Sequence, residues 1–133
     1  MADFDANIAV AQKMYDIVRA GDFSKLDTIV TEDFEIVEAD GLPFGGASRG
    51  RHALRELLER IIPILRPSDI RLKSLTANEN EVVGLLDLIF ADGDGEFIMP
   101  VAEYFEIRDG LISRIVPYFF DTAGLTQFLT RRG

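Results

Sequence analysis

The chain has 133 residues, of which 47% are hydrophobic and 28% charged, and its formal net charge is −9. These values fit one folded domain and exclude a disordered chain. The negative charge disfavours binding to nucleic acid and to anionic membranes, so we expect neither as a partner. With no cysteine and a single histidine, disulfides, thiolate catalysis and cysteine-based zinc sites are excluded, and we expect no metal.

The first half of the chain has mainly helical periodicity. Residues 5–20 are predicted to form a helix, because apolar side chains recur at helical spacing, and Gly21 ends it. A short second helix is predicted to begin at Asp22. A third helix follows residue 50, and Pro63 is expected to end or kink it. Its apolar face consists of Leu54, Leu57, Leu58, Ile61, Ile62 and Leu65.

The second half has mainly β periodicity. One strand is already predicted at residues 34–38, followed by a glycine-rich loop at 40–50. Further strands are predicted at 69–76, 81–91, 95–108 and 111–120, and a last helix at 122–131. Short turns between these strands make them antiparallel neighbours. Helices followed by a strand meander predict a single α+β domain, with the helices on one face of a curved sheet.

Three stretches stand out by their order and spacing: residues 19–22 (RAGD), 41–50 (GLPFGGASRG) and 118–125 (YFFDTAGL). Together they resemble the SnoaL-like branch of the nuclear transport factor two superfamily. The resemblance covers nearly the whole chain. It implies a cone-shaped curved antiparallel sheet with helices on its concave face, a cystatin-like α+β barrel, around a pocket for a small molecule. The same fold serves isomerases, cyclases, epoxide hydrolases and binders without activity.

The resemblance also places candidate catalytic residues. In relatives of the ketosteroid isomerase type, a carboxylate base acts beside a tyrosine and a neutral carboxylic acid. The base of those relatives falls on Glu38, and their neutral acid falls on Glu103. Their tyrosine falls on Met14, with Tyr15 one residue away, which is a departure from the pattern. Polyketide cyclases of this group carry their acid/base residue near the end of the last strand, where this chain has Asp121.

Glu103 is also the leading candidate from strand alternation alone. It shares a face with the apolar residues Val101 and Phe105. An ionised carboxylate on such a face costs several kcal/mol unless it is paired or protonated. The alternative to a functional carboxyl is a salt bridge in the core, to Arg71 or Arg114.

Glu38 shares a strand face with Phe34 and Ile36, so it is expected to point inward at the end of the strand. The alternative is an exposed last residue of the strand, and Asp40 is a possible replacement two residues on. Because water can reach a strand end beside a polar loop, we expect Glu38 to stay ionised near pH 7. Desolvation is expected to keep Glu103 protonated.

For Asp121 and two tyrosines, the alternative to a functional role is a structural one. Asp121 precedes Thr122 and can act as the cap of the last helix. Tyr15 and Tyr118 offer phenolic donors, although buried tyrosines usually bind a structural partner. The side chains expected to line the pocket are Met14, Phe44 and Phe119. Phe44 lies in the glycine-rich loop, which we expect to be a mobile flap over the pocket mouth.

These observations lead to one main hypothesis and two alternatives. The main hypothesis is a cofactor-independent acid/base enzyme, an isomerase, cyclase or hydrolase that acts on an apolar carbonyl or epoxide compound. The alternatives are a binding module without activity and a structural dimer.

The surroundings of the protein are also predicted from the sequence. Residues 82–91 are apolar on both strand faces apart from Asp87, so we expect a homodimer. The chain starts without the basic-then-apolar order of a signal peptide, and no run reaches the roughly 18 apolar residues of a membrane span. We therefore expect a cytoplasmic protein.

Overall fold

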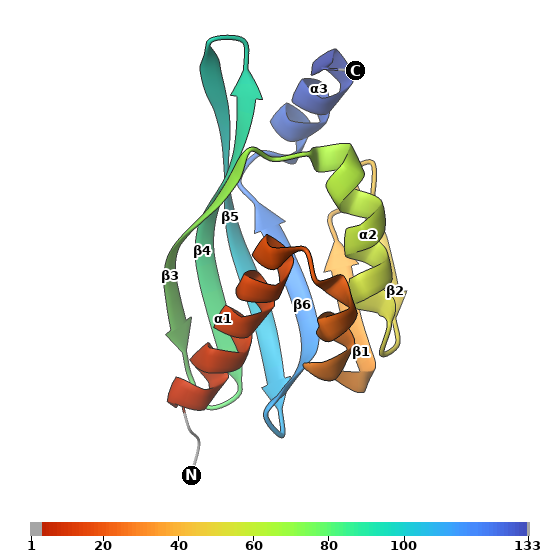
Figure 1. Cartoon of the computed structure of the whole chain (residues 1–133), viewed down its shortest axis with the longest axis vertical. Helices are drawn as coiled ribbons and strands as arrows, with labels where there is room; N and C mark the ends of the chain where they lie inside the picture. The colour runs from red at the N-terminus through yellow and green to blue at the C-terminus, as the bar shows by residue number, and fades with distance from the viewer. Residues whose placement is uncertain (1–3, 133) are drawn as a thin grey trace.

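A computed structural model describes residues 4–132. Within them the chain forms helices first, then strands, and ends in a helix (Figure 1). The elements are α1 (Phe4–Ala20), the 3-10 helix η1 (Phe23–Thr28), β1 (Val30–Glu38), β2 (Gly46–Arg49), α2 (Ala53–Leu65), β3 (Asp69–Ala77), β4 (Glu81–Asp92), β5 (Gly95–Arg108), β6 (Leu111–Phe119) and α3 (Thr122–Arg132). The predicted α+β class and the predicted helix and strand segments are confirmed.

The strands form one curved sheet in the order β2-β1-β6-β5-β4-β3. Strands β3 to β6 are the predicted antiparallel meander, whereas β1 pairs with β6 in parallel. The expectation of a wholly antiparallel sheet is therefore wrong at this one pairing. Its cause is the long connection through β2, α2 and the meander, after which β6 returns beside β1 in the same direction.

The predicted loop at 40–50 contains a strand that the periodicity did not indicate. Strand β2 pairs antiparallel with β1, with Gly46 opposite Glu38 and Ser48 opposite Ile36. Its four residues, GASR, carry no apolar alternation, so only the pairing itself identifies them as a strand. This hairpin folds the glycine-rich segment back onto the end of β1.

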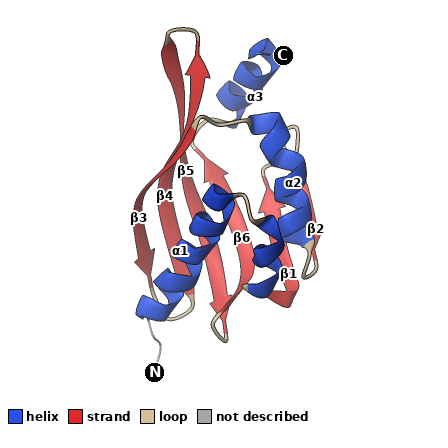
Figure 2. Cartoon of the chain, in the orientation of Figure 1, coloured by secondary structure: helices blue, strands red, loops and turns tan. Residues whose placement is uncertain are grey.

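Helices α1 and α2 lie over the same face of the sheet, and the 3-10 helix η1 contacts both of them (Figure 2). This inner face carries the buried residues of the strands, such as Val101 and Phe105 of β5, which are 5% and 0% exposed. The opposite, outer face is not covered by α1 or α2. No helix among the described residues is both long and apolar enough to cross a membrane.

Pro63 lies inside α2 and neither ends nor visibly shortens the predicted helix. The helix continues to Leu65 and ends at Arg66, which adopts a left-handed backbone with φ of 46°. A proline this near the end removes a hydrogen bond from the last turn only, so the helix can accommodate it. The expectation that the helix ends at Pro63 is therefore wrong.

The C-terminal helix α3 lies beside the long β4–β5 hairpin (Figure 1). Its Phe128 stacks on Phe97, with ring centroids 4.5 Å apart, and packs against Phe90 at 5.3 Å. At the end of α3, Arg132 donates hydrogen bonds to the carbonyl oxygens of Ile64 and Leu65, at 2.7 and 2.6 Å. These carbonyls lack partners within α2, so Arg132 ties α3 to the end of α2.

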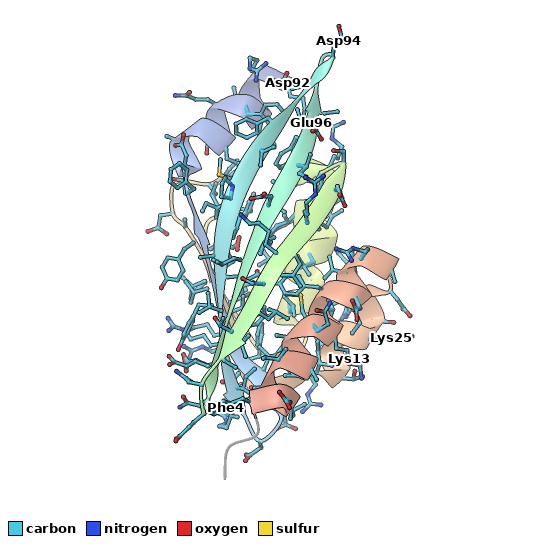
Figure 3. All side chains as sticks on the ribbon, turned by 90° about the vertical axis from the view of Figure 1, so that its left-hand side faces the viewer. Phe4, Lys13, Lys25, Asp92, Asp94 and Glu96 are labelled. Carbon is cyan, nitrogen blue, oxygen red and sulfur yellow. The ribbon has the colours of Figure 1, made fainter. Side chains whose placement is uncertain are left out.

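The acidic residues of the β4–β5 turn lie far from the helices α1 and α2. Figure 3 shows Asp92, Asp94 and Glu96 at the tip of the hairpin, at the opposite end of the molecule from Phe4. Arg131 of α3 reaches this tip and pairs with Asp92 at 3.2 Å. The turn therefore helps to hold α3 against the hairpin.

Replacing Arg132 is expected to weaken the contact between α3 and α2. Arg132→Met keeps an apolar stem but leaves the carbonyls of Ile64 and Leu65 without their donor, so the free energy of unfolding should fall by about 1–2 kcal/mol. Arg131→Met is the matched control, because Arg131 also lies over the Phe128 ring but forms only an exposed ion pair. Urea unfolding of both variants measures the difference. Equal decreases in the free energy of unfolding would contradict the proposed contact between Arg132 and the end of α2.

Candidate functional site

A cavity of about 100 Å³ lies between α1, α2 and the inner face of the sheet. Most of its wall is apolar, with side chains that include Leu54, Ile61, Leu86, Val101 and Pro117. Among its lining residues, three carry polar side chains: Tyr15 from α1, Glu38 from β1 and Glu103 from β5. Two carboxyl groups and a phenol thus share one apolar space.

Glu103 lies on the inner face of β5, as strand alternation predicts. The hydroxyl of Tyr15 donates a hydrogen bond to its Oε1 at 2.6 Å. The alternative of a core salt bridge is wrong, because Arg71 lies near Asp69 and Arg114 binds acidic residues on the outer face. The partner of Glu103 is therefore neutral.

The position of Glu103 raises its pKa. Glu103 is half-buried, and it lines the cavity. Burial raises the pKa of Glu103 to about 7, although the hydrogen bond from Tyr15 opposes the shift. The pKa of Glu103 is therefore raised as expected, but it lies below that of Glu38, so the expectation of a neutral Glu103 beside an ionised Glu38 is wrong.

Glu38 is the last residue of β1 and is only 4% exposed. Its carboxyl makes no hydrogen bond or ion pair with the described residues. Burial, and then the negative charge of Glu103, raise the pKa of Glu38 to about 8. The expectation that Glu38 behaves as an ordinary, solvated carboxylate is therefore wrong.

The reason is the folding of the glycine-rich loop over the end of β1. Leu42 and Phe44 are each 5% exposed, and Phe44 lines the same cavity as Glu38. The turn is tight at Gly45, where a Cβ would collide with the carbonyl oxygen of Ala39. Phe44 is therefore part of the buried wall of the cavity, and water does not reach Glu38 through this loop.

The two carboxyls influence each other's charge, and they differ in how readily each one loses its proton. Tyr15 stabilises the charged form of Glu103, whereas no donor in the described part of the chain stabilises the charge on Glu38. Burial and the neighbouring Glu103 raise the pKa of Tyr15, so its hydroxyl stays protonated and remains a donor. Near neutral pH Glu103 therefore ionises first, and its charge helps Glu38 to keep a proton.

The other predicted site residues divide into two groups. Met14 and Phe119 line the cavity, as does Phe44. Asp40 and Asp121 are exposed, and Tyr118 is 60% exposed. The structure does not bring these three residues to the cavity.

The local chain explains the position of each of the three. Tyr118 alternates with Phe119 along β6 and so faces the outer side of the sheet. Asp40 lies in the turn beyond β1. Asp121 Oδ1 accepts a hydrogen bond of 2.8 Å from the backbone N–H of Gly124, which matches the alternative of a helix cap for α3.

One residue beside the site was not singled out from the sequence. Gly84 of β4 lies directly opposite Glu103 in the sheet, and a Cβ at this position would lie 2.6 Å from the hydroxyl of Tyr15. A glycine inside an otherwise apolar strand is the sequence signal that could have indicated a close approach.

The single histidine, His52, and Asp87 of β4 lie away from the cavity. His52 contacts Asp27 at 2.7 Å, and Asp87 pairs with Lys73 at 3.3 Å. Within residues 4–132, no three histidine, cysteine or acidic side chains are placed to hold a metal ion.

Comparison with known proteins gives one family match. The model of the SnoaL-like domain matches residues 11–115. A search of curated proteins gives no match.

Solved structures share the fold at low sequence identity. Bal32a, from a soil-derived mobile gene cassette, has a TM-score of 0.81 at 16% identity, covering 94% of this chain and 97% of its own. TerC, co-crystallised with polyporic acid, has a TM-score of 0.78 at 20% identity, covering 94% and 98%. An LEH-like epoxide hydrolase from M. tuberculosis has a TM-score of 0.72 at 18% identity, covering 96% and 92%.

The raised pKa of Glu38 predicts how stability depends on pH. The folded protein binds this proton more tightly than the unfolded chain, so stability should fall between about pH 5 and pH 8 and then level off. Glu38→Gln removes this titration and should therefore be the more stable form above pH 8. A gain on the order of 2–4 kcal/mol is expected, from 1.36 kcal/mol for each pKa unit.

Urea unfolding of both proteins between pH 5 and pH 9 measures this effect. Glu35→Gln is the control on the same strand, because arginines hold the pKa of Glu35 below its usual value and it stays ionised throughout this range. Its offset from the native protein should be constant. Parallel pH profiles for Glu38→Gln and the native protein would show that Glu38 titrates normally.

Proposed function

The chain belongs to the SnoaL-like domain family, and from this premise we propose that it is a cofactor-independent acid/base enzyme acting on a small apolar carbonyl compound. One observation carries the proposal: Glu103, Glu38 and Tyr15 share an apolar cavity in which the pKa values of both carboxyls are raised toward neutrality. Such a pair supplies a base and an acid at the same pH.

The proposed reaction moves a proton between two carbon atoms of the substrate. Ionised Glu103 removes a proton from the carbon next to the carbonyl group, and the electron pair of the broken C–H bond moves to the carbonyl oxygen. Neutral Glu38 donates a hydrogen bond to this oxygen as its negative charge develops. Glu103 then returns the proton to a different carbon, which gives an isomer and restores the carboxylate.

The cavity wall supports this chemistry in two ways. Apolar side chains such as Leu86 and Val101 exclude water, so a hydrogen bond to a developing charge is stronger than it is in solution. They also match a substrate whose surface is mainly apolar. TerC was co-crystallised with polyporic acid, and the M. tuberculosis structure is of an epoxide hydrolase, so proteins of this fold include a small-molecule complex and an enzyme.

The test follows proton exchange at carbon directly. A β,γ-unsaturated cyclohexenone in D₂O should gain deuterium next to its carbonyl group, and NMR measures the rate. Glu103→Gln should lower the rate by on the order of 100-fold or more, because it removes the base. Glu38→Gln keeps a hydrogen-bond donor and should lower the rate less. Glu32→Gln, on the same strand as Glu38 but exposed, should leave the rate unchanged.

The pH profile is a second readout of the same experiment. The rate should rise as Glu103 ionises, with a pKa of about 7, and fall as Glu38 ionises, with a pKa of about 8. A ligand that binds the native protein with no exchange above background would instead favour a binding module without activity.

We also propose that two copies of the chain pair through the outer face of the sheet. Leu85 is 45% exposed and Tyr118 is 60% exposed, and both flank Ala102 on neighbouring strands. Ile98, at 45%, and Phe120, at 83%, are further large exposed apolar residues. Burial of this face against a second copy would remove an apolar surface from water.

Sedimentation velocity tests the pairing. The native chain should sediment as a dimer at micromolar concentration, and Leu85→Asp should shift it to a monomer because two charged groups would meet across the interface. Lys13→Asp, on the exposed side of α1, is the control for an added negative charge (Figure 3). A native monomer at this concentration would contradict the proposal.

A further inference from the structure

Gly84 lies in β4, opposite one of the two carboxyl residues that line the cavity. It pairs with Glu103 of β5, and its strand neighbours on the same face, Val82 and Leu86, are buried at 0% and 4% exposure. A side chain at position 84 would therefore point toward α1. A Cβ there would lie 2.6 Å from Tyr15 Oη and 3.2 Å from Leu75 Cδ2.

The backbone does not require a glycine at this position. Gly84 is not among the residues with a positive φ, and the β4–β5 pairing continues without a break on both sides of it. Glycine in the interior of a strand costs stability, since it adds no packing and loses more chain entropy on folding. The feature that does require a glycine is the close approach of the Tyr15 hydroxyl.

Tyr15 has little freedom to move away from an added side chain. Its ring is 6% exposed and meets the ring of Phe105 edge to face, with centroids 5.9 Å apart. The hydroxyl is held between Gly84 on one side and Glu103 Oε1, at 2.6 Å, on the other. Because the ring is fixed by packing, a methyl group at position 84 displaces the hydroxyl and with it the hydrogen bond to Glu103.

We propose that Gly84 is a positioning residue: its missing side chain lets the Tyr15 hydroxyl reach Glu103, and this contact selects Glu103 over Glu38 as the charged carboxyl of the pair. The titratable groups that line the cavity from all its elements are Tyr15, Glu38 and Glu103, so the selection rests on this one hydrogen bond. Only the catalytic consequence of the inference rests on the proposed function.

Carboxyl titration by carbon NMR of protein with labelled glutamate tests the geometric part. Tyr15→Phe removes the hydrogen bond and should raise the pKa of Glu103 by roughly one unit. Gly84→Ala should raise it similarly although Tyr15 is still present, and combining the two changes should add no further shift. Gly95→Ala is the control, because its Cβ meets nothing closer than 3.7 Å in the same hairpin, and it should leave Glu103 unchanged.

Stability supplies an independent measurement on the same variants. Gly84→Ala should destabilise the native protein but cost less in the Tyr15→Phe background, where the hydroxyl that it meets is gone. If Gly84→Ala alone does not fold, its recovery in the Tyr15→Phe background supports the proposal. An equal loss in both backgrounds, or a Gly84→Ala protein in which Glu103 titrates as in the native one, overturns it.

The titration and exchange experiments together distinguish a failure of the positioning role of Gly84 from a failure of the proposed enzymatic function. If Gly84→Ala and Tyr15→Phe shift the titration of Glu103 but the native protein exchanges no protons of the cyclohexenone, the positioning role stands and the enzyme proposal fails. If exchange occurs and Gly84→Ala leaves both its rate and its pH profile unchanged, the enzyme proposal stands and the positioning role fails.

Discussion

Two carboxyl groups line one apolar cavity, where a charged carboxylate is less stable than it is in water. The other features of the site determine which of the two carboxyls carries a charge. The free-energy cost of burial is small while both groups are protonated and large when both are charged. A single hydrogen bond from Tyr15 stabilises a single charge, on Glu103. Near neutral pH the site therefore favours one ionised and one protonated carboxyl, which is the state that acid/base chemistry needs.

Elements far apart in the chain maintain this state. The wall opposite the sheet comes from α2, and α2 is held at its end by Arg132 of α3. The glycine-rich loop contributes Phe44 to the cavity wall, and Glu38 beside it is buried. Loss of any of these contacts would admit water, lower both pKa values toward those of free glutamate and remove the difference between the carboxyls.

The sequence predicted the parts of this site that depend on periodicity. Alternation along β5 placed Glu103 inward, and the helical stripe placed Met14 and Tyr15 on the buried side of α1. Periodicity could not predict the closure of the loop after Glu38, because that depends on tertiary contacts of Phe44 and on the pairing of β2. Periodicity also could not decide whether Asp121 caps a helix or acts in catalysis, because both roles require the same residue at the same position.

The parallel pairing of β1 with β6 has a consequence for the order in which the chain folds. The β4–β5 hairpin is closed by a short turn, whereas β1 is fixed beside β6 only when Val30 reaches Ile112. Contacts between residues so distant in sequence form slowly, because a long loop must close first. A chain that has built the hairpin but not yet this pairing holds Glu38 in water as an ordinary ionised carboxylate. Docking of β1 beside β6 thus moves Glu38 from water into an apolar interior, and proton uptake by Glu38 accompanies that step.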